Sequence, residues 1–265
     1  RAIRMQSLRN RYGAWALVTG ASSGLGEEFA RQLAAEGFNL YLLARRRERL
    51  EALGEELTEL NGVECRSLAI DLNAAEFLQD VSEQTAGTEI GLLVNNAGFT
   101  NYGKFLENDL AAEENLVNVN CRAITSLAHH FGGLMRDRGR GAMIVTSSIV
   151  GFTSVPVWGA YAASKSYDLL LAEALAVEWK PHDIDVLALC PGATRTEFAD
   201  YQGLSARLFA MDTKAVVSGA LKNIGRRTVY IPGFLNRMNV LTTRFLPRRL
   251  SARIFSVLIR DMVHE

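Results

Sequence analysis

The chain has 265 residues, 48% of them hydrophobic and 22% charged, which is the composition of a globular protein and not of a disordered or fibrous one. Its 29 basic and 29 acidic residues give a formal net charge of zero, so we expect no nucleic-acid partner. Cys65, Cys121 and Cys190 lie far apart without a CxxC or Cys/His cluster, which argues against a disulfide framework or zinc site and favours a reducing compartment such as the cytoplasm.

Short apolar runs alternate with longer segments of helical periodicity along the chain. We expect strands at 14–20, 39–44, 64–70, 91–98, 142–148, 185–190 and 228–232. We expect helices at 25–37, 46–60, 74–86, 110–137 and 156–179. No stretch approaches the ~20 apolar residues that a membrane-spanning helix needs, and the basic N-terminus has no apolar run behind it that would indicate a signal peptide.

Strands that are apolar throughout and separated by helices are typical of a parallel sheet covered on both faces. With right-handed crossovers, the sequence predicts an α/β fold: a Rossmann-type, doubly wound sheet of about seven strands. We interpret residues 1–265 as a single domain, because no linker or repeat interrupts the pattern. Within it we expect a core at 12–232, a substrate lid at 195–213 and basic amphipathic helices at 233–265.

The first predicted strand runs into a glycine-rich turn, "TGASSGLG" (19–26), that opens the first predicted helix. Glycines allow a tight turn and let the backbone approach a pyrophosphate, which the helix N-terminus attracts. Glycines at such turns are also common as simple chain punctuation, but this position in an α/β pattern favours a dinucleotide site. Its candidate contacts are Gly20, Ser22, Ser23, Gly24, Leu25 and Gly26.

The end of the second predicted strand bears on the choice of cofactor. A doubly wound site for NAD(H) places an acidic residue there, whereas an Arg accepts the 2′-phosphate of NADP(H). This chain has Ala44 at that point, followed by Arg45 and Arg46. Arginines near a helix N-terminus are opposed by the helix dipole, and a guanidinium binds phosphate with a bidentate fork. A solvated helix start is the alternative; we favour NADP(H) as cofactor.

Five motifs follow one another along the chain: "TGASSGLG" (19–26), "NNAG" (95–98), "SSIVG" (147–151), "YAASK" (161–165) and "PGATRT" (191–196). In that order they resemble the short-chain dehydrogenase/reductase family, over residues 14 to about 200. The resemblance implies a Rossmann-type fold and reversible hydride transfer between a nicotinamide cofactor and a carbonyl or alcohol. It also implies a homodimer or homotetramer.

The resemblance assigns roles residue by residue. Tyr161 would be the catalytic acid/base with Lys165 as its partner, Ser148 would contact the substrate oxygen, and Asn120 would hold the water of a proton relay. Asn118 is the alternative for that last role, and we favour Asn120. The further cofactor contacts that the resemblance implies are Asp71, Leu72, Asn96, Ala97, Gly98, Pro191, Gly192, Thr194 and Thr196, together with Tyr161 and Lys165.

The spacing of Tyr161 and Lys165 suits this chemistry. Four residues apart, they share one face of a helix, roughly 6 Å apart along its axis. A phenol with an ordinary pKa near 10 is a weak acid, and a nearby cation favours its ionised form. We interpret the small residues 162–164 as clearance for the nicotinamide. Outside the context of the other motifs, the pair would be better explained as a core tyrosine and a solvated lysine.

The segments expected to face the substrate are apolar. They contain Phe99, Ile149, Val150, Val155, Val157 and Trp158, and the predicted lid contributes Phe198, Tyr201, Leu204, Leu208, Phe209 and Met211. Of these, Val150, Trp158 and Phe198 are the candidate substrate contacts beside Ser148 and Tyr161. Without a charged cluster for a small acid, we expect a lipophilic ketone or alcohol: a 3-oxoacyl thioester, a steroid-like ketone or a xenobiotic ketone.

The C-terminal segment is strongly basic. Residues 213–260 carry 10 Lys and Arg and no Asp or Glu. Within 234–260, apolar residues recur at helical spacing with Arg between them and Pro247 as a break, which predicts two basic amphipathic helices. Such helices lie on an anionic membrane surface, or pack on the domain or on a second subunit. Both alternatives stay open.

Two classes of function fit these observations. The first is an NADPH-dependent carbonyl reductase, and the second is a non-catalytic NADP(H)-binding sensor or scaffold built on the same fold. The set of Asn120, Ser148, Tyr161 and Lys165 favours the enzyme, because a protein that only binds the cofactor does not need it.

Overall fold

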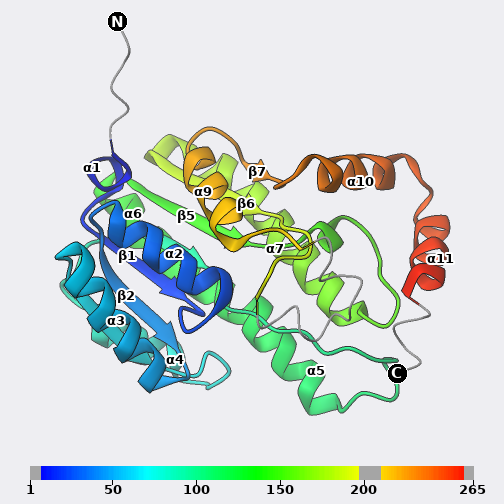
Figure 1. Ribbon diagram of the computed structural model, residues 1–265, viewed down its shortest axis with the longest axis horizontal. Helices are drawn as coiled ribbons and strands as arrows, with labels where there is room; N and C mark the ends of the chain where they lie inside the picture. Colours follow the sequence, from blue (N-terminus) through cyan, green and yellow to red (C-terminus); the bar gives the residue numbers. More distant parts are fainter. Residues whose placement is uncertain (1–6, 197–209, 260–265) are drawn as a thin grey trace, which may run out of the picture.

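The computed structural model describes residues 7–196 and 210–259, without the side chains of 244 and 255–259 (Figure 1). The strands are β1 (Trp15–Thr19), β2 (Asn39–Ala44), β3 (Cys65–Ala69), β4 (Ile90–Asn95), β5 (Gly141–Thr146), β6 (Ile184–Leu189) and β7 (Val229–Tyr230). They form one seven-stranded sheet in the order β3-β2-β1-β4-β5-β6-β7, with every pair parallel. The predicted doubly wound sheet is confirmed.

Helices connect the strands. They are α1 (Leu8–Tyr12), α2 (Gly24–Ala35), α3 (Arg47–Asn61), α4 (Phe77–Thr85), α5 (Leu110–Val117), η1 (Asn118–Ala123), α6 (Ile124–Arg138), η2 (Ile149–Phe152), α7 (Gly159–Glu178), η3 (Lys180–His182), α9 (Thr213–Asn223), α10 (Phe234–Phe245) and α11 (Arg248–Ile259). Because the strand order reverses at β1, a crevice opens where the carboxyl ends of β1 and β4 meet.

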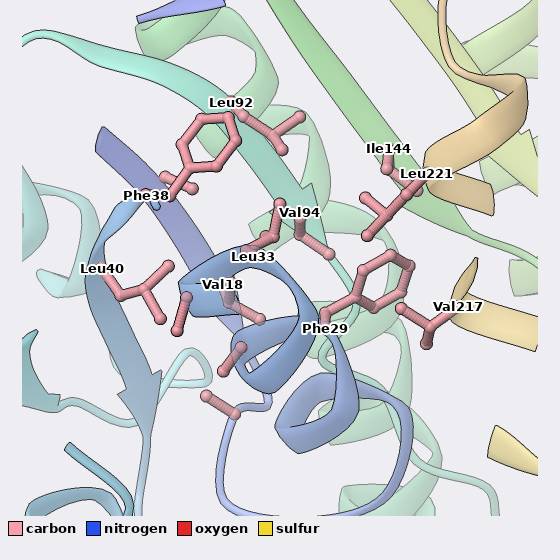
Figure 2. Packing of buried hydrophobic residues seen from close by; sticks show 14 of the residues in the cluster. Val18, Phe29, Leu33, Phe38, Leu40, Leu92, Val94, Ile144, Val217 and Leu221 are labelled. Atoms are coloured by element: carbon pink, nitrogen blue, oxygen red, sulfur yellow. The ribbon is translucent and has the colours of Figure 1, made fainter. Parts of the chain in front are cut away.

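Successive residues of each strand point to opposite faces of the sheet, which makes two cores. Val18 of β1 packs with α2, α3 and α9, whereas its neighbour Leu17 packs with α4, α6 and α7. Figure 2 shows the first core, where Phe29 and Leu33 of α2 lie among strand residues that include Val94. All of these side chains are less than 2% exposed. Burial on both faces explains why the inner strands β1, β2, β4, β5 and β6 are mainly apolar.

Two expected helices have different boundaries in the structure. The segment 110–137 is divided into α5, a π-helical turn η1 and α6. The helix expected from 156 begins at Gly159, because Val157 just before it adopts φ +59°, which a β-branched residue rarely does and which no helix contains.

The sequence analysis named no helix at α1 or α9. In α9, Asp212 accepts a hydrogen bond from the Lys214 backbone N–H, and Val216 and Val217 are fully buried. Its propensity signal is weak, since valine is a poor helix former, and packing against α2 stabilises it instead.

An ion pair between the partly exposed Arg11 and the buried Asp185 ties α1 to β6. The carboxylate of Asp185 accepts hydrogen bonds from Arg11 and from the Tyr12 hydroxyl, the latter at 2.9 Å. Burial, then the negative charge of Asp185, raises the pKa of Tyr12. This group lies at the amino end of β6, at the opposite end of the strand from the residues described below.

The two C-terminal helices are amphipathic, as expected. Their inner side includes Val240 and Ser251, which are 5% and 3% exposed, and the Ser251 hydroxyl lies 2.7 Å from that of Thr153. In Figure 1, α10 (orange) and α11 (red) lie to one side of the sheet. Within the described part of the chain, no helix combines the length and the hydropathy needed to cross a lipid bilayer.

Candidate active site

A large cavity runs along the carboxyl edge of the sheet. Its volume is about 1040 Å³, and segments that follow β1 through β6 line it. It gathers nearly all of the predicted cofactor contacts from six separate segments: Gly20, Ser22, Ser23, Gly24, Leu25, Arg45, Arg46, Asp71, Leu72, Asn96, Ala97, Gly98, Tyr161, Lys165, Pro191, Gly192, Thr194 and Thr196. The parallel topology explains this convergence, because all strand ends meet at one edge.

Gly26 does not line the cavity but makes the glycine turn possible. A Cβ at this position would lie 2.1 Å from the carbonyl oxygen of Gly20, closer than any side chain allows. Gly20 and Gly24 adopt φ of +67° and +59°, the left-handed region that favours glycine. The turn therefore brings bare backbone and the N-terminus of α2 to the cavity wall, a cradle that fits the pyrophosphate of a dinucleotide.

Arg45 and Arg46 line the cavity, where we expected them to contact the cofactor. Arg46 donates from Nε to the Ser22 hydroxyl at 3.1 Å and from Nη2 to the Ser22 carbonyl at 3.2 Å, which holds its guanidinium over the glycine turn. Arg45 is exposed and lines the same cavity. Ala44 is 9% exposed and offers no acidic group there. This arrangement suits a 2′-phosphate better than a ribose hydroxyl.

Asn96 has a structural role beside its place on the cavity wall. Its side chain donates to the Thr19 carbonyl at 3.1 Å and accepts from the Thr146 hydroxyl at 3.1 Å. The Thr19 hydroxyl in turn accepts from the backbone N–H groups of Asn96 and Ala97, each at 2.9 Å. These bonds brace the carboxyl ends of β1, β4 and β5. This role of Thr19 could not be predicted from the local sequence, because its partner Asn96 lies 77 positions away.

Asp71 and Leu72 follow β3 at the adenine end of the predicted site. Asp71 accepts a hydrogen bond from the Asn73 backbone N–H at 2.9 Å, and Leu72 is 5% exposed. Arg122 donates to the carbonyls of Leu72, Asn73 and Ala74, which fixes this loop.

Ser148, Tyr161 and Lys165 meet at the other end of the cavity. Ser148 follows β5, and its hydroxyl accepts from the Val150 backbone N–H and donates to the Pro191 carbonyl, both at 3.3 Å. Tyr161 lies in the first turn of α7 and is 8% exposed, with Lys165 one turn further on. The Lys165 Nζ atom lies 5.9 Å from the centre of the Tyr161 ring.

The electrostatic surroundings of Tyr161 are mixed. Burial raises the pKa of Tyr161 above its ordinary value of 10.0, the Lys165 ammonium acts to lower it, Asp168 raises it, and a hydrogen bond with Ser148 lowers it. The effect of Lys165 has the expected sign, but the net pKa shift is upward because desolvation is the largest contribution. Tyr161 is therefore held in its protonated form at neutral pH, as a proton donor requires.

Lys165 is 4% exposed and forms two hydrogen bonds within the protein. Nζ donates to the Thr146 carbonyl and to the Asp168 carboxylate, each at 2.9 Å. Asp168 did not appear in any motif, although its position three residues after Lys165 places the two on one helix face. Spacing could have suggested the pair, but not that both charges are buried.

Asn120 lies in the π-helical turn η1 and is fully buried. Its side chain accepts from the Phe99 backbone N–H at 3.1 Å and donates to the Phe99 carbonyl and to the Ser164 hydroxyl, both at 3.0 Å. Asn118 instead donates to the Asn73 side chain at 3.1 Å. Asn120 is thus the one of the two that lies beside α7, although it does not line the cavity. π-helical turns within α-helices are frequent at functional sites.

The interpretation of residues 162–164 as clearance for the nicotinamide is wrong. Ala162, Ala163 and Ser164 do not line the large cavity. Ala162 packs with Leu116 of α5, and Ser164 accepts the hydrogen bond from Asn120. The small side chains let α5 and η1 approach α7, which places Asn120 against the helix that carries Tyr161.

An apolar cluster surrounds Tyr161 at the mouth of the cavity. Phe99, Ile149, Val150 and Trp158 line the cavity as expected. The Trp158 ring packs against the Tyr161 ring at a centroid distance of 5.9 Å. Val155, at 2% exposed, lies within the cluster and not on the cavity wall. Phe198 and the predicted lid residues Tyr201, Leu204, Leu208 and Phe209 lie outside the described residues.

The comparison with protein families matches most of the chain. The family model described as "short chain dehydrogenase" matches residues 14–205. A "7beta-hydroxysteroid dehydrogenase" of Clostridium sardiniense is 32% identical over 87% of this chain and 90% of its own length. A "Very-long-chain 3-oxoacyl-CoA reductase" of Podospora anserina is 32% identical over 80% of this chain and 64% of its own length.

Solved structures agree with this picture. A structure from a study of "7beta-hydroxysteroid dehydrogenase stereoselectivity" superposes with a TM-score of 0.89, covering 95% of this chain and 100% of that chain at 28% identity. A short-chain dehydrogenase from Sphingobium yanoikuyae in complex with NADPH superposes with a TM-score of 0.79, covering 87% of this chain and 93% of that chain at 33% identity. The likeness extends over the whole cavity-forming part of the fold.

Proposed function

The chain belongs to the short-chain dehydrogenase family, and on that premise we propose that it is an NADP(H)-dependent oxidoreductase that interconverts a lipophilic ketone and its alcohol. The family resemblance predicted from five motifs is confirmed by the match over residues 14–205. The observation that carries the proposal is the convergence of Ser148, Tyr161 and Lys165 at one end of a cavity whose other end is a glycine turn with two arginines.

The chain's own groups fit NADP(H). The glycine turn and the N-terminus of α2 would hold the pyrophosphate, and the guanidinium of Arg46, with Arg45 beside it, would bind the 2′-phosphate. A structural neighbour of this chain was solved with NADPH. The cofactor, when bound, supplies or accepts the hydride.

Tyr161 would move the proton. In ketone reduction its hydroxyl donates to the developing alkoxide oxygen, and its raised pKa keeps the proton available at neutral pH. Ser148 would donate a hydrogen bond to the same oxygen, and the Lys165 ammonium stabilises the phenolate left behind. Asn120 would support the relay of the next proton from its place between Phe99 and α7.

Substrate class is inferred from the walls next to Tyr161. Phe99, Ile149, Val150 and Trp158 are apolar, and a hydrophobic wall favours a bulky carbon skeleton over a hydroxylated one. Relatives of this chain are described as hydroxysteroid dehydrogenases and 3-oxoacyl-CoA reductases. We therefore propose steroid-like ketones first, with 3-oxoacyl thioesters and xenobiotic ketones as the other members of the class.

A turnover screen tests the proposal. Purified protein is given NADPH with steroid ketones, a 3-oxoacyl thioester, an aryl ketone and small polar sugars, and absorbance of NADPH is followed. We expect turnover of lipophilic ketones. Turnover of sugars alone would contradict the proposed substrate class.

The same screen separates an enzyme from a non-catalytic sensor. Tyr161→Phe removes only the hydroxyl, so we expect it still to bind NADPH and to lose about 10²–10⁴-fold in turnover of any accepted ketone. Unchanged turnover would refute the role of Tyr161. NADPH binding without turnover in the wild type would favour the sensor.

The outer surface of α10 and α11 has the features of a surface that contacts a partner outside this domain. Its apolar side chains are exposed: Leu235 by 74%, Met238 by 42%, Leu241 by 47% and Phe245 by 81%. The described residues of this segment include arginines and no Asp or Glu. We propose that this surface contacts an anionic lipid surface. The predicted homodimer or homotetramer stays a prediction, and a second copy on this surface is the competing outcome of the test given below.

A further inference from the structure

Asp168 is a buried carboxylate that the assigned chemistry does not use. Its side chain is 0% exposed, and Oδ2 accepts a hydrogen bond from Lys165 Nζ at 2.9 Å. The other oxygen, Oδ1, is buried and has no hydrogen-bond partner among the described residues. A fully desolvated and half-satisfied carboxylate in the centre of α7 needs a physical reason.

Stability is not a sufficient reason. Removing a carboxylate and an ammonium from water costs several kcal/mol per ion, and their attraction often does no more than offset that cost. Burial raises the pKa of Asp168 to about 6, although Lys165 acts to lower it. The group is therefore mostly ionised at neutral pH, and its charge acts on its neighbours.

The first effect of Asp168 is on the charge of Lys165. Burial alone lowers the pKa of a lysine, and a fully buried lysine without a counter-charge can lose its proton near neutral pH. Here burial is the largest effect and acts to lower the pKa of Lys165, but Asp168, followed by Tyr161 and Cys121, acts to raise it, and the net pKa shift is upward. Asp168 acts on Lys165 both through its charge and through its hydrogen bond, so it is the main group that maintains the ammonium.

The second effect is on the direction of the ammonium. Lys165 has three N–H donors, and two are taken by Asp168 and by the Thr146 carbonyl. The described residues offer no acceptor for the third, and Lys165 lines the cavity beside Gly98. A Cβ built on Gly98 would lie 3.4 Å from Nζ, which places the ammonium directly behind this stretch of cavity wall.

The other titratable groups around the pair are neutral. Tyr161 lies on the same helix, Cys121 on η1 and Cys190 directly after β6. Burial is the largest cause that raises the pKa of the Cys121 thiol to about 11 and that of the Cys190 thiol to about 12. Asp168 therefore provides the negative charge that balances Lys165 at neutral pH.

We propose that Asp168 is a positioning residue that keeps Lys165 in its ammonium form and directs its remaining N–H toward the cofactor site. This inference rests on the proposed function, in which Lys165 serves the cofactor and Tyr161.

Asp168→Asn is the first test, because it keeps the size and an oxygen acceptor but removes the charge. The dissociation constant of NADPH is measured against pH, a readout that needs no turnover. We expect wild-type affinity to stay constant from neutral pH to about pH 10, whereas the affinity of Asp168→Asn falls about tenfold or more over that range, as Lys165 loses its proton. A variant whose affinity follows the wild type at every pH would overturn the proposal.

The pH profile of alcohol oxidation gives the second readout. The reaction needs the Tyr161 phenolate, so its rate rises with pH. If Lys165 becomes neutral in Asp168→Asn, the pKa of Tyr161 rises and this limb moves to higher pH by about one unit or more. If Lys165 instead stays charged, loss of the carboxylate lowers the pKa of Tyr161 and the limb moves to lower pH, which contradicts the proposal.

Asp185→Asn is the matched control, since it removes another buried carboxylate, 7% exposed, far from the cavity. We expect it to lower the midpoint of thermal unfolding and to leave both pH profiles unchanged.

If Asp168→Asn does not fold, Lys165→Met with Asp168→Leu replaces the ion pair by apolar groups. Folding of that double variant supports the proposal, and its failure to fold contradicts it. If the wild type reduces no ketone, the proposed function fails while the NADPH affinity series still decides the role of Asp168.

Discussion

At the scale of single residues, the site depends on groups whose chemistry is changed by burial. Tyr161 and Lys165 were recognisable from their spacing. The structure places the Lys165 Nζ atom 5.9 Å from the centre of the Tyr161 ring, with Ser148 beside the phenol. Asn120 was preferred over Asn118 in the sequence, and only the contact with Ser164 shows which of them reaches α7. Asp168 belongs to no motif, and we propose that it controls the charge of Lys165, which does.

The arginines give a prediction at this scale. Arg46→Ala removes a guanidinium held by Ser22 at the cavity wall, and Arg45→Ala removes its neighbour. Because a charge-assisted contact with phosphate contributes about 1.5–3 kcal/mol, we expect each variant to raise the KM for NADPH about tenfold or more. The KM for NADH should change little. Steady-state kinetics with both cofactors measure the ratio of the two KM values.

Arg47→Ala is the control for this prediction. Arg47 is an exposed arginine of the same run that pairs with Glu51 and does not line the cavity. We expect wild-type KM values for both cofactors. An equal loss of NADPH affinity in all three variants would mean that the run acts only through its overall charge.

At the scale of elements, local sequence patterns predict the strands, whereas tertiary structure sets several helix boundaries. All seven strands were placed within a few residues. The inner strands β1, β2, β4, β5 and β6 are buried almost throughout and are mainly apolar, whereas β3 and β7 at the sheet edges are only partly buried. Helix boundaries were less well predicted. The break at Gly159 comes from the conformation of Val157, the division of 110–137 comes from η1, and α9 forms through packing on α2.

The turn between β1 and α2 gives the prediction for this scale. In Gly26→Ala the new Cβ would meet the Gly20 carbonyl oxygen at 2.1 Å and Asn96 Nδ2 at 2.7 Å, so the turn has to shift. We expect a loss of about 1–3 kcal/mol in the free energy of unfolding and a marked loss of NADPH affinity. Urea denaturation and cofactor titration measure the two effects.

Gly133→Ala is the matched control on α6. A Cβ at this position meets no heavy atom within 4 Å. Since alanine favours helix over glycine, we expect an increase in stability of up to about 1 kcal/mol and unchanged NADPH affinity. Wild-type affinity in Gly26→Ala would show that the tight turn is not needed for the cofactor.

At the scale of the whole molecule, the uneven distribution of charge matters more than the net charge of zero. Residues 213–260 hold ten positive charges and no negative ones, so the remainder of the chain is net acidic. The structure places part of this basic segment on α10 and α11, where Arg237 and Arg249 are exposed, as are the apolar Leu241 and Phe245. A composition without charge bias therefore conceals a surface with a strong one.

This surface gives the prediction for the whole molecule. The full chain is sedimented with vesicles of phosphatidylcholine alone or with phosphatidylserine added. We expect binding that needs the anionic lipid and weakens as ionic strength rises. Leu241→Glu with Phe245→Glu should abolish it, because both apolar anchors are replaced by negative charge.

Leu60→Glu is the control, since Leu60 is 70% exposed on α3 at a distant part of the chain. It should bind vesicles like the wild type. Equal sedimentation of all proteins on neutral vesicles would exclude the electrostatic contact. A change from dimer to monomer in the double variant, measured by size-exclusion chromatography without any lipid binding, would identify a second copy as the partner instead.

The sheet, the order of the motifs and the pairing of Tyr161 with Lys165 follow from the amino-acid pattern alone, because these depend on periodicity and on contacts within one turn of helix. Which side chains are removed from water depends on the folded chain. The tertiary structure shows that Ala162 serves helix packing and that the carboxylate of Asp168 is buried against the ammonium. The physical reason is that desolvation depends on elements far apart in the chain, and desolvation controls the charge of a buried group.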